Sequence, residues 1–157
     1  MNGPARSERD AVDLVDAAQD QVAGLMVART GAVVGIGIDA VDIDRLRMML
    51  ARRRHLGARL FTPGEQAYAG EARDPTPRLA TRFAAKEAVM KALRVGLGAF
   101  AFQDVEVVRE GTDAPHLVLH GAAARLSAQT GAVRWHLSLS HTDALALAVV
   151  VADGGGA

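Results

Sequence analysis

The sequence predicts an α+β fold, in which helices pack on a mostly antiparallel sheet. Apolar residues recur at helical spacing across Arg78–Leu93, which indicates a long amphipathic helix. Two apolar segments near the C-terminus, Val133–Ser140 and Leu145–Val151, are separated by a short turn and are typical of paired strands. Phe102–Val108 and His116–Leu119 flank a turn-rich segment and predict a hairpin. Strands joined by short turns pair antiparallel, so we expect a mostly antiparallel sheet. The helices are expected to pack on that sheet.

Length and composition fit one globular domain with an aliphatic core. The chain has 157 residues, of which 50% are hydrophobic and only 4% aromatic. Cysteine is absent, which excludes disulfides and thiolate metal sites. No apolar run reaches the ~18 residues that a membrane span needs. The first residues are polar and acidic, unlike a secretory signal. We therefore expect a cytoplasmic protein with no membrane partner.

Residues 1–31 are expected to form an extension that consists mainly of one amphipathic helix. Ser7 can cap a helix over about residues 8–29, and Thr30-Gly31 ends it. Because its stripe is apolar, we expect the helix to pack against the rest of the molecule. The stripe comprises Val12, Val15, Val22, Leu25 and Met26.

The domain proper is predicted over residues 32–152. It begins with a short buried strand, Ala32–Ile38, followed by a helix from about Val41 to His55. A further helix begins at Thr62–Glu65, where a proline stands at the first helical position and an acid in the first turn. The proline-rich segment Asp74–Pro77 ends that helix.

The remaining elements follow the long helix. Gly96 and Gly98 form a loop before the hairpin, and a short helix is predicted over Gly121–Thr130. His141-Thr142-Asp143 connects the last two strands. Residues 153–157 are expected to form a disordered tail.

The formal net charge is zero, but the charges are unevenly spread. Residues 1–44 contain eight acids against three arginines, whereas residues 45–59 contain six arginines and no acid. A basic segment in a neutral protein indicates an acidic partner contacted at one place, and the alternative is a solvated helix face. The six are Arg45, Arg47, Arg52, Arg53, Arg54 and Arg59.

Two carboxylates occupy positions that could hold a metal. Asp39 ends a strand and precedes a helix, so it is either the helix N-cap or an oxygen ligand for Mg²⁺ beside a phosphate. Glu87 projects into the apolar side of the long helix, between Phe83 and Met90, where a carboxylate needs a partner. That partner is either a metal ion or Lys91, one turn further along.

His141 lies at the end of a predicted strand. It follows Leu137 and Leu139 at a spacing of two and so shares their face of the sheet. It is either a hydrogen-bonded core histidine or a general base in contact with a phosphate.

Four sequence blocks, taken in order, carry a resemblance to a known family. They are Gly35–Leu46 (GIGIDAVDIDRL), Phe61–Glu65 (FTPGE), Arg82–Ala92 (RFAAKEAVMKA) and His136–Thr142 (HLSLSHT). Together they resemble the holo-acyl-carrier-protein synthase family, the short type of 4′-phosphopantetheinyl transferase. The resemblance covers about residues 32–151. It implies that family's fold and its usual trimer, with active sites between subunits.

The resemblance also implies an activity and the residues that carry it. The activity is transfer of 4′-phosphopantetheine from coenzyme A to a serine of an apo acyl- or peptidyl-carrier protein, with release of 3′,5′-adenosine bisphosphate. Asp39 and Glu87 would hold Mg²⁺, or alternatively Mn²⁺, against the pyrophosphate, and Lys91 would contact the phosphates. The serine proton would go to Glu65 through a water, to His141 or to a metal-bound water. Further coenzyme A contacts would come from Arg82, Lys86, Gly96 and His141.

The resemblance further implies that the arginine helix docks the carrier protein. Arg45 begins that helix and Arg52 and Arg53 also lie on it. The carriers of fatty-acid, polyketide and peptide assembly are all acidic. This chain departs from the family by about thirty residues before the first block. It also has Arg94 where many relatives have a glycine.

Two other functions remain open on the residues alone. The arginine run could belong to a non-catalytic module that binds a carrier protein or nucleic acid. The neutral net charge and the few aromatics disfavour this, and we expect no nucleic-acid partner. A metal-dependent phosphohydrolase could use Asp39, Glu87 and Lys91, and it would cleave coenzyme A without a carrier protein.

Overall fold

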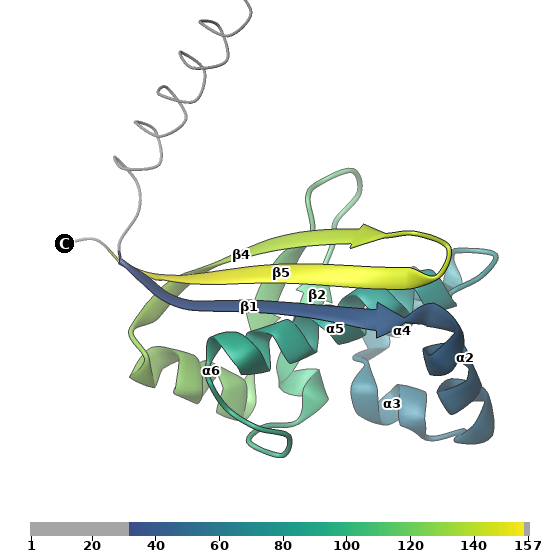
Figure 1. Cartoon of the computed structure of the whole chain (residues 1–157), viewed down its shortest axis with the longest axis horizontal. Coiled ribbons are helices and arrows are strands. Elements are labelled where there is room, and N and C mark those ends of the chain that lie inside the picture. Colours follow the sequence, from purple (N-terminus) through teal and green to yellow (C-terminus); the bar gives the residue numbers. More distant parts are fainter. Residues whose placement is uncertain (1–31, 156–157) are drawn as a thin grey trace, which may run out of the picture.

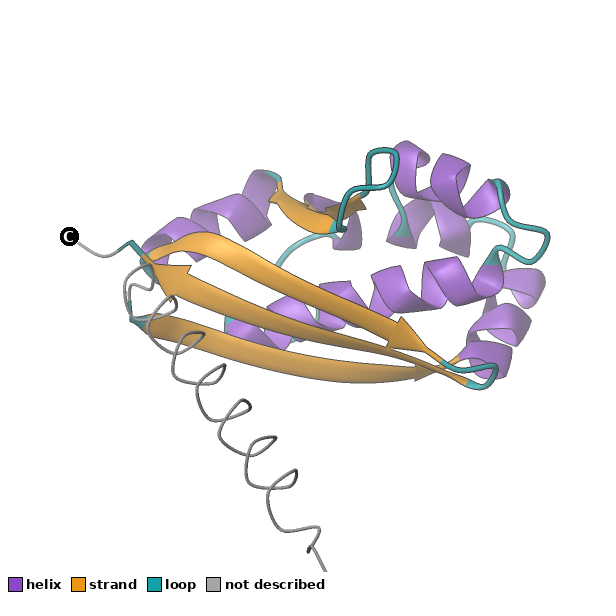
Figure 2. Ribbon diagram, turned by 90° about the horizontal axis from the view of Figure 1, so that it is seen from above, coloured by secondary structure: helices purple, strands orange, loops and turns teal. Residues whose placement is uncertain are grey.

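The computed structural model describes residues 32–155. Its larger sheet has three antiparallel strands in the order β1-β5-β4, where β1 is Val33–Asp42, β4 is Ala132–His141 and β5 is Leu145–Gly154. All the described helices lie on one side of this sheet (Figures 1 and 2). The α+β architecture with an antiparallel sheet agrees with the prediction.

The long helix α5 (Thr76–Ala92) packs lengthwise on β1 and β5. Its contact face is made of alanines, including Ala84, Ala85 and Ala88, which are fully buried. Two glycines of β1 permit the close approach: a Cβ on Gly35 would lie 2.3 Å from Ala92 O, and one on Gly37 would lie 1.8 Å from Ala88 O. Small residues on both elements therefore fix the position of α5 against the strand.

Three short helices link β1 to α5. They are α2 (Ile43–Arg52), α3 (Leu56–Leu60) and α4 (Pro63–Gly70). The predicted start of α4 is confirmed: Thr62 accepts the Glu65 N–H, and the Glu65 carboxylate accepts the Thr62 N–H, which together form a capping box.

A second, two-stranded sheet pairs β2 (Val105–Val108) with β3 (His116–Leu119), and α6 (Gly121–Gln129) follows it. Phe102–Asp104, predicted as strand, forms a 3₁₀ turn instead. The main core lies between α5, the two sheets and α6, and includes Val89, Val105 and Val150.

Several predicted boundaries are wrong. The strand expected over Ala32–Ile38 continues to Asp42, so Asp39 lies inside it and not at its end. The helix expected from Val41 begins at Ile43, because Val41 and Asp42 still pair with β5. Residues 153 and 154, expected in a disordered tail, belong to β5, and Asp153 is only 2% exposed. Asp153 accepts hydrogen bonds from Arg134 Nε at 3.0 Å and lies 2.7 Å from His136 Nε2, which holds the strand end in place. The predicted helix of residues 8–29 lies outside the described residues.

The face of the larger sheet opposite α5 carries apolar side chains that stay exposed. Ile36 and Ile38 alternate with the glycines of β1 and are 65% and 54% exposed. Leu147, Val149 and Val151 of β5 are half-buried on the same side. No described helix covers this face (Figure 2). In the described part of the chain, no helix has the length and apolar character that a bilayer crossing requires.

Candidate active site

Asp39 and Glu87 line one cavity of about 460 Å³, between the end of β1, α2 and α5. Asp39 follows Gly35 and Gly37 at a spacing of two, so it points to the face of β1 on which α5 packs. Glu87 comes from the middle of α5 and meets it there. Arg45 and Phe83 line the same cavity. The structure therefore brings together the two predicted metal ligands.

Lys91 forms its ion pair with Asp39. Its Nζ donates to Asp39 Oδ1 at 2.8 Å and to the Ile38 carbonyl at 2.9 Å. The alternative in which Glu87 pairs with Lys91 is wrong, because no such pair occurs among the ion pairs of residues 32–155. The N-cap alternative for Asp39 is also wrong: the helix cap is Asp42, which accepts the Arg45 N–H at 2.8 Å.

The electrostatics of this cavity favour a bound cation. Partial burial raises the pKa of Glu87, and the negative charge of Asp39 and a hydrogen bond between the two carboxyl groups raise it further. Lys91 opposes the shift but does not cancel it. Within residues 32–155 Glu87 has no ion-pair partner of its own, so a cation bound between it and Asp39 would favour the ionised form of both carboxyl groups.

The donor set suits a hard cation such as Mg²⁺. Asp39 and Glu87 are the two carboxylates that would hold it, and residues 32–155 contain no group of three or more histidine or acidic side chains arranged around one point. Mg²⁺ commonly binds through one or two carboxylates and completes its shell with waters and substrate phosphates.

A second cavity of about 330 Å³ lies on another side of α5. Arg82 is 3% exposed, and burial lowers its pKa. Its Nη1 donates to the Arg78 carbonyl at 3.1 Å, but its buried Nε has no partner in the described part of the chain. An unpaired guanidinium donor beside a cavity is suited to an anion. The cavity is also lined by Tyr68, Arg78, Arg109 and His141.

His141 is exposed at the mouth of this second cavity, so its interpretation as a core histidine is wrong. Its Nδ1 lies 3.3 Å from the Thr142 carbonyl, and the rest of the ring remains accessible. The position leaves it free to meet a ligand.

Sequence reasoning missed Tyr68, Arg78 and Arg109 in this cavity. The centroid of the Tyr68 ring lies 4.4 Å from the guanidinium carbon of Arg78 and 4.1 Å from that of Arg82, so one ring contacts both arginines. The one sequence feature that could have pointed to this cavity is Tyr68 itself, because it is the only tyrosine in a chain with few aromatics.

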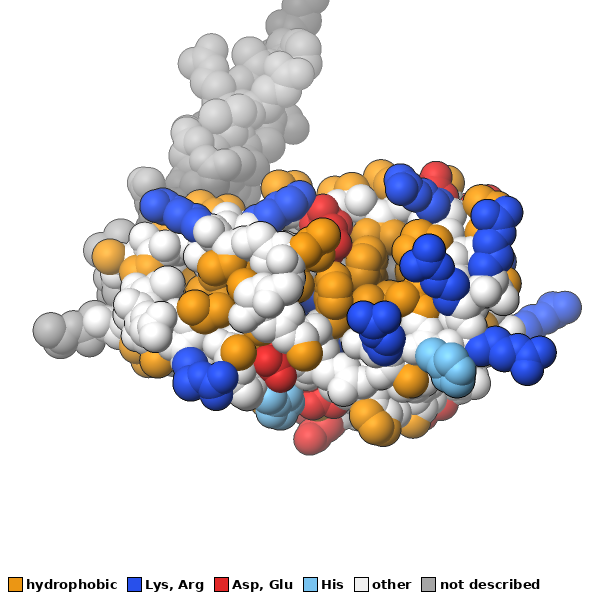
Figure 3. Space-filling model, turned by 90° about the horizontal axis from the view of Figure 1, so that it is seen from below, with side chains coloured by type: hydrophobic (Ala, Val, Ile, Leu, Met, Phe, Trp, Pro, Cys, Tyr) orange, Lys and Arg blue, Asp and Glu red, His pale blue; other side chains and the backbone are white. Residues whose placement is uncertain are grey.

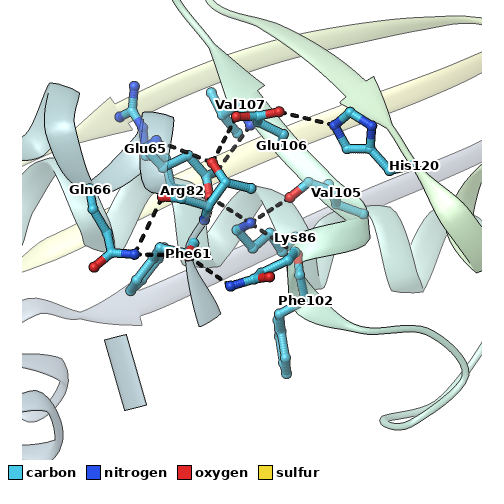
Figure 4. Close-up of polar contacts among 12 residues, drawn as sticks. Phe61, Glu65, Gln66, Arg82, Lys86, Phe102, Val105, Glu106, Val107 and His120 are labelled. Atoms are coloured by element: carbon cyan, nitrogen blue, oxygen red, sulfur yellow. Dashed lines mark hydrogen bonds and ion pairs between the residues drawn. The ribbon is translucent and has the colours of Figure 1, made fainter. Parts of the chain in front are cut away.

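Lys86 and Glu65 lie in the interior and line neither of these cavities (Figure 4). Lys86 is fully buried: its Nζ lies 2.8 Å from Glu65 Oε2 and 3.0 Å from the Phe102 carbonyl, and it also contacts the Val105 carbonyl. Glu65 is 1% exposed and accepts the Val107 N–H at 3.0 Å. Their placement favours a structural role over the predicted contacts with coenzyme A and the serine proton.

Gly96 stands in the exposed loop after α5 and lines neither of the two cavities. Arg94, two residues before it, adopts a φ of 57°, in the left-handed region that favours glycine. An arginine is accommodated there with some backbone strain.

Arg45, Arg52 and Arg53 are exposed on α2 and at its end. Figure 3 shows lysine and arginine side chains gathered over this end of the molecule, around a hollow where hydrophobic side chains are visible. Since Arg45 also lines the cavity of Asp39 and Glu87, the basic surface borders the predicted metal site.

The comparison with known proteins decides the family. A family model described as the 4′-phosphopantetheinyl transferase superfamily matches residues 35–150. The chain belongs to this superfamily. Holo-[acyl-carrier-protein] synthases resemble it closely: that of Moorella thermoacetica is 45% identical, over 74% of this chain and 91% of the relative, and that of Clavibacter sepedonicus is 46% identical, over 78% and 98%.

Solved structures of 4′-phosphopantetheinyl transferases share the fold. The holo-[acyl-carrier-protein] synthase of Neisseria meningitidis has a TM-score of 0.70 at 32% identity, covering 77% of this chain and 98% of that one. The Bacillus anthracis enzyme in complex with CoA (3′,5′-ADP) has a TM-score of 0.65 at 32% identity, covering 78% and 98%. The family recognised from the four sequence blocks, and the prediction that the chain is an enzyme of that family, are confirmed.

Proposed function

We propose that this transferase moves the 4′-phosphopantetheine group of coenzyme A onto a serine of an acidic apo-carrier protein, with Mg²⁺ as the required ion, and releases 3′,5′-adenosine bisphosphate. The observation that supports it most is that Asp39 and Glu87, distant in sequence, line one cavity. Among relatives, the holo-[acyl-carrier-protein] synthase of Helicobacter pylori has been solved in complex with coenzyme A, at 30% identity to this chain.

The ion at Asp39 and Glu87 would neutralise charge on the diphosphate while the phosphorus–oxygen bond is exchanged. The carrier serine attacks the β-phosphorus, and the bond to the adenosine bisphosphate breaks. Lys91, held against Asp39, offers its ammonium to the phosphate oxygens. Positioning and charge neutralisation are the main requirements, and no covalent enzyme intermediate is needed.

Of the side chains predicted as base, His141 is retained and Glu65 is not. His141 is exposed and beside a cavity, whereas the oxygens of Glu65 are occupied inside the core. Arg82, with its unpaired Nε, and its neighbours Arg78 and Arg109 would hold the phosphates of the adenosine end.

The two cavities share no lining residue in one chain. Arg82 and Glu87 lie about 140° apart around α5, since successive helical residues are rotated by roughly 100°. We infer a homotrimer in which the Asp39–Glu87 cavity of one copy adjoins the Arg82–His141 cavity of the next. The exposed Ile36 and Ile38 supply an apolar sheet face for such an assembly.

A mass measurement on the carrier protein tests the proposed reaction. Incubation of an apo-carrier with coenzyme A, Mg²⁺ and this protein should add ~340 Da to the carrier, the size of one phosphopantetheinyl group moved by metal-assisted phosphoryl transfer. The addition should disappear with a chelator and return with Mg²⁺ or Mn²⁺. Cleavage of coenzyme A without a carrier, and no gain in carrier mass, would instead indicate the phosphohydrolase. A cytoplasmic location and the absence of a nucleic-acid partner remain predictions.

A further inference from the structure

We propose that the acidic segment of residues 8–20 binds the arginine surface of α2 in the same assembly and competes there with the carrier protein. The arginine surface is defined as Arg45, Met48, Met49, Arg52 and Arg53. The inference rests on the proposed function, because it concerns regulation of the same docking surface.

The arginine surface combines positive charge with an apolar stripe. Arg45, Met48 and Arg52 lie three, four and seven positions apart on α2, so they share one face with Met49. Met48 is 52% exposed. Within residues 32–155 no ion pair involves Arg45, Arg52 or Arg53, whereas Arg47 on the neighbouring face pairs with Asp44 and Asp74. Such a surface suits an acidic ligand that also carries apolar side chains.

The sequence of residues 8–20 has that composition. It contains five acids and only one basic residue, Arg9. Val12 and Val15 alternate with the acids, so one side of the segment can present both charge and apolar groups. The acids are Glu8, Asp10, Asp13, Asp16 and Asp20.

The segment is long enough to reach α2. Residue 32 stands at the start of β1, and α2 follows the other end of that ten-residue strand (Figure 1). A strand of this length spans about 33 Å. The chain from Asp20 to Ala32 spans up to ~40 Å when extended, and a helix over residues 8–29 would itself be about 33 Å long.

The segment also lies outside the part of the chain that matches the family. The family model begins at residue 35, and the Clavibacter sepedonicus relative is covered over 98% of its length by only 78% of this chain. The transfer reaction of that family therefore does not require the segment. Tethering places its acids near α2 at an effective concentration on the order of millimolar, enough to compete with a free carrier protein.

Cross-linking tests the contact without any catalysis. The native chain has no cysteine, so the double variant Asp16→Cys/Met48→Cys carries one defined pair. A short bifunctional maleimide should link this pair within the full chain or between its copies, and 0.5 M NaCl should slow the reaction strongly, since salt screens the attraction. The control is Asp16→Cys/Leu97→Cys. Leu97 is 77% exposed and follows the end of α5 that packs against Gly35, nearer to residue 32.

A random tether would favour the Leu97 pair, so preferential linkage to position 48 supports the proposal. Equal or slower linkage at position 48 overturns it. Because this measurement needs neither coenzyme A nor carrier, its outcome does not depend on whether the proposed transfer occurs.

Kinetics test the competition. In the full chain, Asp13→Asn/Asp16→Asn should lower the KM for apo-carrier about three-fold, leaving kcat and the KM for coenzyme A unchanged. Glu110→Gln/Asp113→Asn, on the exposed β2–β3 turn, makes the same change in net charge and should leave the carrier KM as it is. An unchanged carrier KM for the first variant, or an equal drop for both, overturns the competition.

Discussion

At the scale of single residues, the side chains of the predicted site divide into two groups. Asp39 and Glu87 line one cavity and Lys91 pairs with Asp39, whereas Glu65 and Lys86 form a buried ion pair. Lys86 and Glu87 are neighbours in one motif, yet one supports the core and the other faces a cavity. The motif identified both as important, but only the packing around α5 separates a ligand from a structural residue.

Ionised Glu87 should destabilise the folded chain. Its pKa is raised by burial and by Asp39, so ionisation costs the folded state more than the unfolded state. As pH rises above the ordinary glutamate value of 4.5, the wild type should lose stability relative to Glu87→Gln, until the raised pKa is passed. Thermal unfolding of both proteins from pH 4 to 8 measures this. A difference that does not change with pH would contradict it.

The same pair of proteins tests the metal site. Millimolar Mg²⁺ should raise the Tm of the wild type, because a ligand that binds only the folded state stabilises it. The increase should be absent in Glu87→Gln, and transfer activity should fall by at least about a hundred-fold with the loss of one of two ligands. An equal Mg²⁺ effect on both proteins would remove Glu87 from the site.

Breaking the buried ion pair should be costly. Lys86→Met leaves the Glu65 carboxylate buried without its partner, which should lower the free energy of unfolding by about 3–5 kcal/mol. Glu65→Gln in the same chain removes the stranded charge and should recover part of that loss. Urea denaturation measures both. The prediction fails if the double variant is less stable than Lys86→Met alone.

At the scale of elements, α5 was predictable because its sequence pattern and its packing agree. It was expected over Arg78–Leu93 and runs over Thr76–Ala92. The end of β1 was not predictable, because Val41 and Asp42 are held in the strand by β5, more than a hundred residues later. The second cavity was not predicted from the sequence for the same reason. Its lining residues Tyr68, Arg78 and Arg109 are separated in the chain and meet only when it is folded.

The C-terminus of α5 should become more stable with glycine at position 94. The Arg94 N–H bonds to the Lys91 carbonyl and the Val95 N–H to the Met90 carbonyl, the pattern of a helix ending through a left-handed residue. Arg94→Gly should raise the free energy of unfolding by about 1 kcal/mol, as the strain of a side chain in this region is relieved. Chemical denaturation tests it, and a loss of stability would show that the arginine side chain makes a compensating contact.

Helix α2 should govern carrier binding. Arg45→Ala should raise the KM for apo-carrier about five-fold, equivalent to ~1 kcal/mol, and the effect should shrink at high salt. Arg125→Ala removes an exposed arginine from α6 and serves as the matched control. If both variants behave alike, α2 is not the docking helix.

At the scale of the whole molecule, one chain presents two separate cavities on different sides of α5, and the predicted site residues are divided between them. The sequence blocks predicted residues of both cavities, but they did not predict that the two cavities lie apart. A linear motif does not show on which side of a packed helix each residue lies. The separation, together with the open apolar face of the sheet, is why we infer that neighbouring copies complete each other's sites.

Complementation between two inactive variants tests this account most directly. Glu87→Gln damages one cavity and His141→Ala the other, so each alone should transfer little or no phosphopantetheine. Co-expressed in equal amounts, they should form mixed trimers in which about one interface in four joins two intact halves. The account predicts recovery of roughly a quarter of wild-type activity, and activity no higher than that of the separate variants would contradict it.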